Sequence, residues 1–284
     1  MDEVFVKKKL FGKEAGFILF DVEKAIAEHI VEGAYEEGLA LSKIFNFYDP
    51  HSELSGLNSK RGIEASRDLL KVLKRSIEMS KLTKGGYDAS LGKLFLARKS
   101  GLKEPRLNCS FKDILIEKSK VRLANSEAKV DLGSIAKGYI GDRLASYIKK
   151  HGVISAVIDA RGDLVLFGNT KRIVGIQHPR DKDKMIAFIK AKCIAIATSG
   201  DYSQYIQSFE RSHIINKKDA ISVTVIAKDL MTADALATAL FVVDKRRREK
   251  ILKQNPKIKA LVIDKNLNLH YYNGFKNMVV GADS

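Results

Sequence analysis

The stretch Asp-Leu-Gly-Ser-Ile-Ala-Lys-Gly at residues 131–138 carries residue types suited to chemistry on an anionic ligand. A carboxylate, Asp131, and an ammonium, Lys137, flank small residues at the expected start of a helix. Glycine lets a backbone approach a ligand closely, and a helix N-terminus presents free N–H groups to an anion. The stretch indicates a phosphate site, although it lacks the Gly-x-x-x-x-Gly-Lys-Ser/Thr spacing of a P-loop. An ordinary turn from a strand into a helix, with a lysine on the surface, explains it equally well.

A second candidate lies in the small, apolar segment 231–240. Asp234 and Thr238 stand at i and i+4, so their oxygens leave one side of a helix one turn apart. An unpaired carboxylate is unfavourable among apolar neighbours. A hard cation such as Mg²⁺ would supply the partner, because it takes oxygen ligands and often bridges to phosphates. In the alternative, Asp234 caps its own helix and Thr238 bonds back to that helix.

Two shorter segments add polar groups that could act on a ligand. His213 precedes two branched apolar residues, and histidine is the side chain best matched to proton transfer near neutral pH. A lone histidine is more often structural or on the surface. Residues 198–202, Thr-Ser-Gly-Asp-Tyr, follow an apolar run and suit contact with a polar ligand, or form an ordinary turn.

Composition limits the class of protein. The 284 residues include 45% hydrophobic residues, enough for a substantial core, so a mainly disordered chain is excluded. The net charge of +16 comes from scattered lysines without a nucleic-acid-binding motif, and no nucleic-acid partner is expected. Two cysteines form neither a disulfide framework nor a zinc spacing. No apolar run is long enough for a transmembrane segment and no signal peptide or lipoprotein cysteine is evident, so we expect a cytoplasmic protein.

The elements that must position these residues alternate between helix and strand. The pattern predicts one α+β domain over residues 1–284, with an antiparallel-rich sheet and packed helices. Asp21 is expected to cap the first long helix. Helices are predicted from Asp21 to about Phe45, over 66–82, from Ser134 to about Lys150, from Thr232 to about Val243 and over 246–254. Strands are predicted at 15–20, 113–123, 126–131, 153–159, 163–168, 171–177, 185–190, 193–197, 221–227, 258–263 and 268–272.

The order of these segments resembles the ApbE family of FAD:protein FMN transferases. The resemblance rests on eight motifs in the family's order, from about residue 45 to 243. They are Tyr48-Asp49-Pro50-His51-Ser52-Glu53-Leu54-Ser55-Gly56-Leu57-Asn58, Gly86-Tyr87-Asp88-Ala89-Ser90, Asp131-Leu132-Gly133-Ser134-Ile135-Ala136-Lys137-Gly138-Tyr139, Gly162-Asp163-Leu164, Gly175-Ile176-Gln177-His178-Pro179, Thr198-Ser199-Gly200-Asp201-Tyr202, Ser212-His213-Ile214-Ile215 and Thr232-Ala233-Asp234-Ala235-Leu236-Ala237-Thr238-Ala239.

The resemblance implies a T-fold-related flavin transferase domain that binds FAD and Mg²⁺. Family members move FMN from FAD onto a threonine hydroxyl of an acceptor protein and release AMP. It implies that Asp234, Thr238 and the main-chain carbonyl of Ser134 bind the metal. It implies FAD contacts from Tyr48, whose ring would stack on the flavin, and from Asp88, Asp131, Lys137 and the backbone near Ile215. His213 would be the general base.

Several positions depart from the family pattern. Asn216-Lys217-Lys218-Asp219 replaces the usual Asp-Pro and Thr-Gly turn, Phe11-Gly12-Lys13 replaces Met-Gly-Thr, and Arg161 replaces the first glycine of a Gly-Gly-Asp turn. Two alternatives to transfer stay open. Water in place of the threonine hydroxyl would make the protein an FAD pyrophosphatase that yields FMN and AMP, and loss of catalysis would leave an FAD-binding protein.

Overall fold

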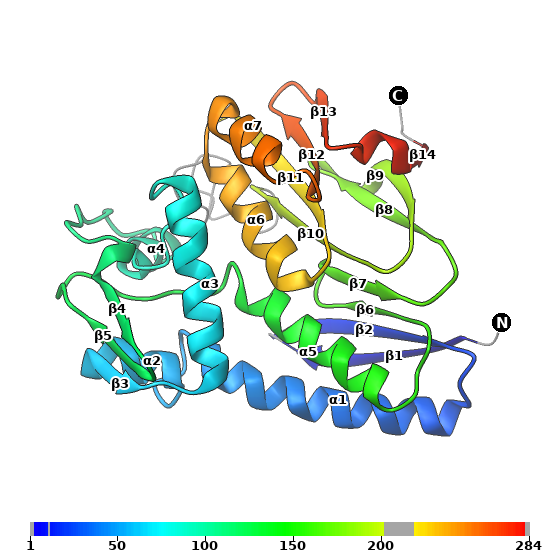
Figure 1. The fold of residues 1–284 in the computed structure, drawn as a ribbon, viewed down its shortest axis with the longest axis horizontal. Coiled ribbons are helices and arrows are strands. Elements are labelled where there is room, and N and C mark those ends of the chain that lie inside the picture. The colour runs from blue at the N-terminus through cyan, green and yellow to red at the C-terminus, as the bar shows by residue number, and fades with distance from the viewer. Residues whose placement is uncertain (1–2, 11, 202–218, 282–284) are drawn as a thin grey trace.

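The computed structural model describes residues 3–10, 12–201 and 219–281. Its central element is an eight-stranded sheet in the order β1-β2-β6-β7-β10-β11-β12-β13, in which every neighbouring pair is antiparallel (Figure 1). The strands are β1 Glu3–Leu10, β2 Lys13–Phe20, β6 Ala156–Asp159, β7 Leu164–Phe167, β10 Ile194–Gly200, β11 Ala220–Ala227, β12 Lys259–Asp264 and β13 Leu269–Tyr272.

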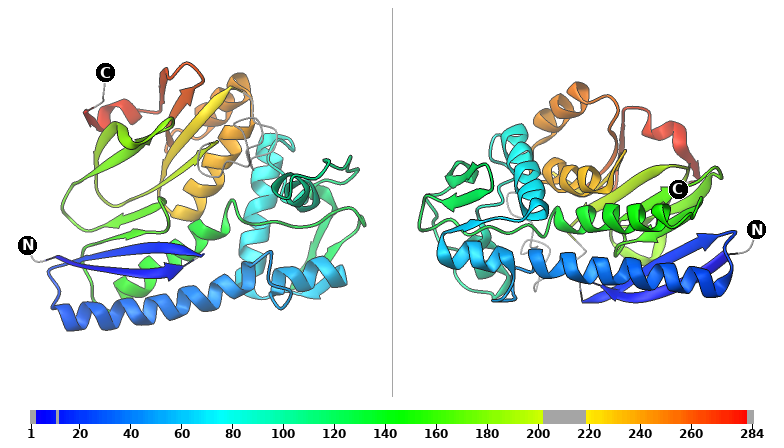
Figure 2. Two further views of the ribbon diagram at one scale, coloured as in Figure 1. Left: turned by 180° about the vertical axis from the view of Figure 1, so that it is seen from behind. Right: turned by 60° about the horizontal axis from the view of Figure 1, so that its bottom comes forward.

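Helices cover one face of this sheet (Figure 2). Helix α6 packs on β10 and β11, α5 packs on β6 and β7, and α1 contacts β1 and α5. Their apolar side chains form the larger of two cores. The bounds are α1 Lys24–Phe45, α5 Ala136–Lys150, α6 Leu230–Val242 and α7 Lys245–Gln254.

A three-stranded antiparallel sheet, β14-β9-β8, lies over the opposite face and encloses the second core. The strand β11 lies between the two layers and is buried along its whole length. Val223 and Val225 join the helix-side core, whereas Ile226 joins the sheet-side core, because successive side chains of a strand point to opposite faces. The bounds are β8 Arg172–His178, β9 Asp181–Ala191, the 3₁₀ helix η3 Phe275–Met278 and β14 Val279–Gly281.

The remaining elements form a lobe beside the end of α1 (Figures 1 and 2). A small sheet, β3-β5-β4, packs there with three helices, and its buried residues belong to the same core as those of α5 and α6. The bounds are α2 Glu53–Lys60, β3 Gly62–Glu64, α3 Arg67–Thr83, α4 Gly92–Lys99, the 3₁₀ helix η1 Phe111–Asp113, β4 Ile114–Glu117 and β5 Lys120–Leu123.

Helices α5 and α6 each cap the other's N-terminus with a carboxylate. Asp142 of α5 accepts hydrogen bonds from the main-chain N–H groups of Leu230 at 2.7 Å and Met231 at 2.9 Å. Asp234 of α6 accepts one from the N–H of Gly138 at 3.0 Å. The first N–H groups of a helix lack partners within the helix, so these bonds satisfy them and fix the two helices relative to each other.

Burial raises the pKa of Asp142 to about 6, although its two main-chain hydrogen bonds act in the opposite direction. The unfolded chain ionises this carboxyl near 3.8, so the folded state holds an extra proton between these pH values. The resulting stabilisation is complete below pH 4 and lost above pH 6. We therefore expect the wild type to lose on the order of 2 kcal/mol of unfolding free energy relative to Asp142→Asn between pH 4 and pH 7. Urea unfolding of both proteins at several pH values measures this, and parallel pH profiles would contradict it.

The α+β class and the antiparallel-rich sheet are confirmed, as are the five helices predicted from the sequence, within about three residues at their ends. The predicted strand at 126–131 is wrong, because Lys129 makes only an isolated bridge with Leu91. The prediction that Asp21 caps α1 is also wrong, because the capping position is Glu23 and Asp21 turns the chain with φ 57°. The short helices α2 and α4 and the edge strand β1 were not predicted.

Within residues 3–10, 12–201 and 219–281, no helix is long and apolar enough to cross a membrane.

Candidate functional site

A cavity of about 1880 Å³ lies where the lobe meets the first turns of α5 and the end of the large sheet. All seven predicted site residues within the described parts of the chain line it. They are Tyr48, Asp88, Asp131, Ser134, Lys137, Asp234 and Thr238. The predicted base His213 and the predicted FAD contact at Ile215 lie outside the described residues. The fold thus brings together residues that are up to 190 positions apart in the sequence.

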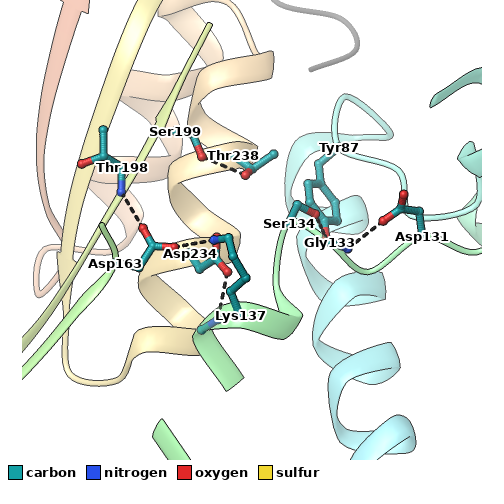
Figure 3. A network of polar contacts seen from close by, with 11 residues as sticks. Tyr87, Asp131, Gly133, Ser134, Lys137, Asp163, Thr198, Ser199, Asp234 and Thr238 are labelled. Carbon is teal, nitrogen blue, oxygen red and sulfur yellow. Dashed lines mark hydrogen bonds and ion pairs between the residues drawn. The ribbon is translucent and has the colours of Figure 1, made fainter. Parts of the chain in front are cut away.

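Lys137 stands between two buried carboxylates (Figure 3). Its Nζ pairs closely with Asp163 and lies 3.2 Å from Oδ1 of Asp234, and both carboxylate side chains are 5% exposed. Burial lowers the pKa of Lys137, but the two negative charges outweigh it and hold that pKa above its usual value. Burial raises the pKa of Asp234 to about 6 although the Lys137 charge opposes it. The carboxylate is thus paired, which an apolar helix requires of a buried charge.

The close approach of α5 to α6 depends on Gly138. A Cβ atom at this position would lie 2.4 Å from the carbonyl oxygen of Leu230 and 2.8 Å from Cβ of Asp234. Both distances are far below van der Waals contact, so any side chain would push the helices apart. The sequence predicts free main-chain N–H groups for an anion at this helix start. The N–H of Gly138 is not free, because it donates to the carboxylate of Asp234.

Two hydroxyl groups extend the polar wall beyond Asp234. Thr238 shares a hydrogen bond of 2.9 Å with the hydroxyl of Ser199 at the end of β10, and not with its own helix. Ser134 Oγ lies 2.9 Å from the hydroxyl of the buried Tyr87. Figure 3 shows the loop that carries Ser134 on one side and Thr238 with Ser199 on the other. The alternative in which Asp234 and Thr238 serve only their own helix is therefore wrong, because the N-cap of α6 is Asp229.

The donor set fits a hard cation better than a soft one. Asp234 and Thr238 contribute a carboxylate and a hydroxyl to the cavity wall, and Ser134 lines the same cavity. No described group of three or more His, Cys, Asp or Glu residues forms a metal cluster. Oxygen donors with few protein carboxylates are typical of Mg²⁺ sites, where substrate phosphates and water complete the coordination.

Asp131 and Asp88 reach the cavity wall but differ in how they are held. Oδ1 of Asp131 accepts the N–H of Gly133 at 2.7 Å, and burial raises the pKa of this carboxyl. Both oxygens of Asp88 are used inside the protein. Oδ1 accepts the N–H of Ser90 at 2.9 Å, and Oδ2 accepts the N–H of Phe111 at 2.9 Å. Asp88 therefore fixes the loop after α3, whichever ligand contact it also makes.

Tyr48 is the most exposed of the seven predicted site residues that the structure describes. Its side chain is 55% exposed and lines the cavity. The Lys99 ammonium lies 4.0 Å from the centre of its ring and donates to its hydroxyl at 2.8 Å. This open aromatic ring offers a flat apolar surface for a planar ligand.

Reasoning from the sequence missed the role of Asp163. Its Oδ1 accepts the N–H of Thr198 at 3.1 Å, while its Oδ2 pairs with Lys137. It therefore ties β7 to β10 and places the lysine at the same time. The only local signal is an aspartate after Gly162 and before an apolar strand, which is typical of any hairpin turn.

These features define an α+β protein with an oxygen-lined cavity beside a helix start, suited to a phosphate ligand and a hard cation. Comparison with known proteins places it more closely. The model of the ApbE family matches residues 13–262, so the chain belongs to the ApbE family.

Relatives and solved structures agree with this assignment. A Vibrio cholerae protein named FAD:protein FMN transferase is 30% identical over 77% of this chain and 74% of its own. A Treponema pallidum protein of the same name is 27% identical over 75% of this chain and 70% of its own. The crystal structure of the ApbE protein from Thermotoga maritima matches with a TM-score of 0.86 at 24% identity, over 98% of this chain and 99% of its own. The flavin transferase ApbE from V. cholerae has a TM-score of 0.81 at 24% identity, with the same two coverages. At this identity the two structures establish the shared fold.

Proposed function

We propose that this protein is an Mg²⁺-dependent FAD:protein FMN transferase that moves FMN onto a threonine hydroxyl of an acceptor protein and releases AMP. The observation that carries the proposal is the convergence of seven predicted site residues on one cavity, in whose wall Asp234 and Lys137 form an ion pair. The names of the curated relatives support the same activity. We also propose that residues 1–284 form one functional domain.

Asp234, Thr238 and the Ser134 carbonyl are the groups that would hold Mg²⁺. When bound, the ion would withdraw electron density from the phosphoryl oxygens and offset the charge that develops on them. Lys137 keeps Asp234 ionised and adjacent to the helix start, because its ammonium pairs with that carboxylate and with Asp163. A fixed ammonium beside the pyrophosphate also stabilises negative charge without reorganisation.

The transfer replaces the phosphoanhydride bond between FMN and AMP by a phosphoester bond between FMN and threonine. The threonine oxygen forms a bond to the FMN phosphorus, the bond from that phosphorus to the AMP oxygen breaks, and AMP leaves. The threonine proton must go to a base, because a neutral hydroxyl is a weak nucleophile. We assign this role to His213 and an FAD contact to the backbone near Ile215, on the family resemblance alone. Asp131 and Asp88 would contact FAD from the part of the cavity wall that they line.

Incubation with FAD, Mg²⁺ and a candidate acceptor tests the proposal. Covalent flavin on the acceptor, with one AMP released for each, supports transfer. Release of AMP and FMN without covalent flavin supports an FAD pyrophosphatase. Binding of FAD with neither product supports a non-catalytic FAD-binding protein. An acceptor whose threonine is replaced by alanine is the control for the site of attachment.

Tyr48→Ala is expected to weaken FAD binding by about tenfold, because a stacked aromatic pair contributes about 0.5–1.5 kcal/mol beyond the area it buries. Tyr48→Phe keeps the ring and loses only the hydrogen bond from Lys99, so its FAD affinity should remain close to that of the wild type. Fluorescence titration of FAD measures both, and an exposed side chain predicts little change in melting temperature. Equal FAD affinities for the two variants would contradict flavin stacking on Tyr48.

A further inference from the structure

The turn between β6 and β7 holds an arginine in a conformation that favours glycine. The N–H of Ala160 donates to the carbonyl of Asp163 at 2.8 Å, which closes a two-residue hairpin turn. The two central residues, Arg161 and Gly162, have φ values of 65° and 89°. Positive φ at both positions is typical of a type I′ turn, where Asn and Gly are the usual residues. An arginine is strained here and glycine would not be.

The same turn borders the cavity. Arg161, Gly162 and Asp163 all line it, and the Nε atom of Arg161 is buried. Asp163 is the carboxylate that pairs with Lys137, so the turn adjoins the ion pairs of Lys137 in the cavity wall. The strained Arg161 is therefore a cation close to Lys137 and Asp234, which we propose act on the phosphates of FAD.

The charges around the turn favour a cation at this position. Asp159, Asp163 and Asp234 all line the cavity, and Lys137 pairs with two of them. Burial and the charge of Asp163 raise the pKa of Asp159, which shows that negative charge is concentrated there. A pyrophosphate that enters this region meets like charges. A guanidinium offsets them, and its planar donors match two phosphate oxygens at once.

We infer that Arg161 binds the pyrophosphate of FAD and that this contact offsets the strain at the turn. The inference rests on the proposed function, because it names a further binding residue for the same substrate. In the transfer, the P–O bond to AMP breaks and negative charge develops on the AMP phosphate. A guanidinium on the pyrophosphate stabilises both the bound FAD and this leaving group.

Arg161→Gly separates the strain from the binding, because the two effects have opposite signs. Glycine relieves the turn, so the melting temperature should rise by about 1–4 °C. Loss of the charge-assisted contact should raise the KM for FAD by about tenfold or more. Arg161→Lys keeps the charge and should raise that KM less. The matched control is Lys118→Gly, which removes an exposed cation from another left-handed position, φ 54°, in the β4–β5 turn outside the cavity.

The expected result is a higher melting temperature for both glycine variants and a higher KM for Arg161→Gly alone. An unchanged KM for FAD in Arg161→Gly overturns the inference. An equal rise of this KM in Lys118→Gly overturns it too, because the effect would then reflect only the loss of one positive charge. A fall in melting temperature together with the higher KM overturns it as well, because Arg161 would then be a structural residue. A wild type that neither binds FAD nor transfers FMN overturns the proposed function itself, and it is measured before the variants.

Discussion

Asp234→Asn is expected to lower Mg²⁺-dependent FMN transfer by about a hundredfold or more, because it removes the only carboxylate among the proposed metal-binding groups. Asparagine retains an oxygen that can accept the N–H of Gly138, so the contact between α5 and α6 should persist. Most of the loss should therefore appear in the Mg²⁺ requirement and the turnover rate, and not in the fold. Rates of AMP release and of covalent flavin formation across a range of Mg²⁺ concentrations measure it.

The matched control for this change is Asp229→Asn in the same helix. Asp229 caps α6 by accepting the N–H of Thr232 at 2.8 Å, and asparagine is an equally good N-cap. This variant should transfer FMN at close to the wild-type rate. Transfer by Asp234→Asn with an unaltered Mg²⁺ dependence would exclude Asp234 as a metal ligand.

Lys137→Met is expected to destabilise the protein by about 2–4 kcal/mol at pH 7, because it leaves two buried carboxylates without their shared ammonium. Burial and the remaining charge of Asp163 hold the pKa of Asp234 above that of the unfolded chain. The stability that Asp234 contributes in this variant is then present at low pH and lost as pH rises through that pKa. Its deficit relative to the wild type should therefore be smaller at pH 5 than at pH 7.

Urea unfolding at both pH values measures this deficit. Lys250→Met removes a lysine from the exposed side of α7 and should change stability by less than about 0.5 kcal/mol. If Mg²⁺ binds beside the same carboxylates, it should raise the melting temperature of Lys137→Met more than that of the wild type. A variant as stable as the wild type at pH 7 would show that the two carboxylates do not depend on the lysine.

The local sequence pattern is sufficient to predict an element whose limits depend on residues close by in the sequence. Helix α3 was predicted within one residue because its apolar residues recur on one face and Ser66 caps it. The failures also have local causes. The segment 126–131 alternates like a strand, but its main-chain hydrogen bonds to residues 89–92 amount to a single bridge and not to a ladder. The strand β1 was not predicted because it is rich in lysine. This composition suits its position at the edge of the sheet.

The sequence by itself determined which residue types could do chemistry and, through the order of the motifs, which family they resemble. Only the tertiary structure decided how they are paired. Lys137 meets Asp163 and Asp234 across 26 and 97 residues, and Asp142 caps a helix 88 residues away. Periodicity describes neighbours within one or two turns, whereas these contacts depend on the strand order of the sheet and on the clearance that Gly138 leaves between two helices. The stretch at 131–138 is a turn into a helix, as its residues indicate, but its helix start is completed by a carboxylate that the sheet topology brings to it.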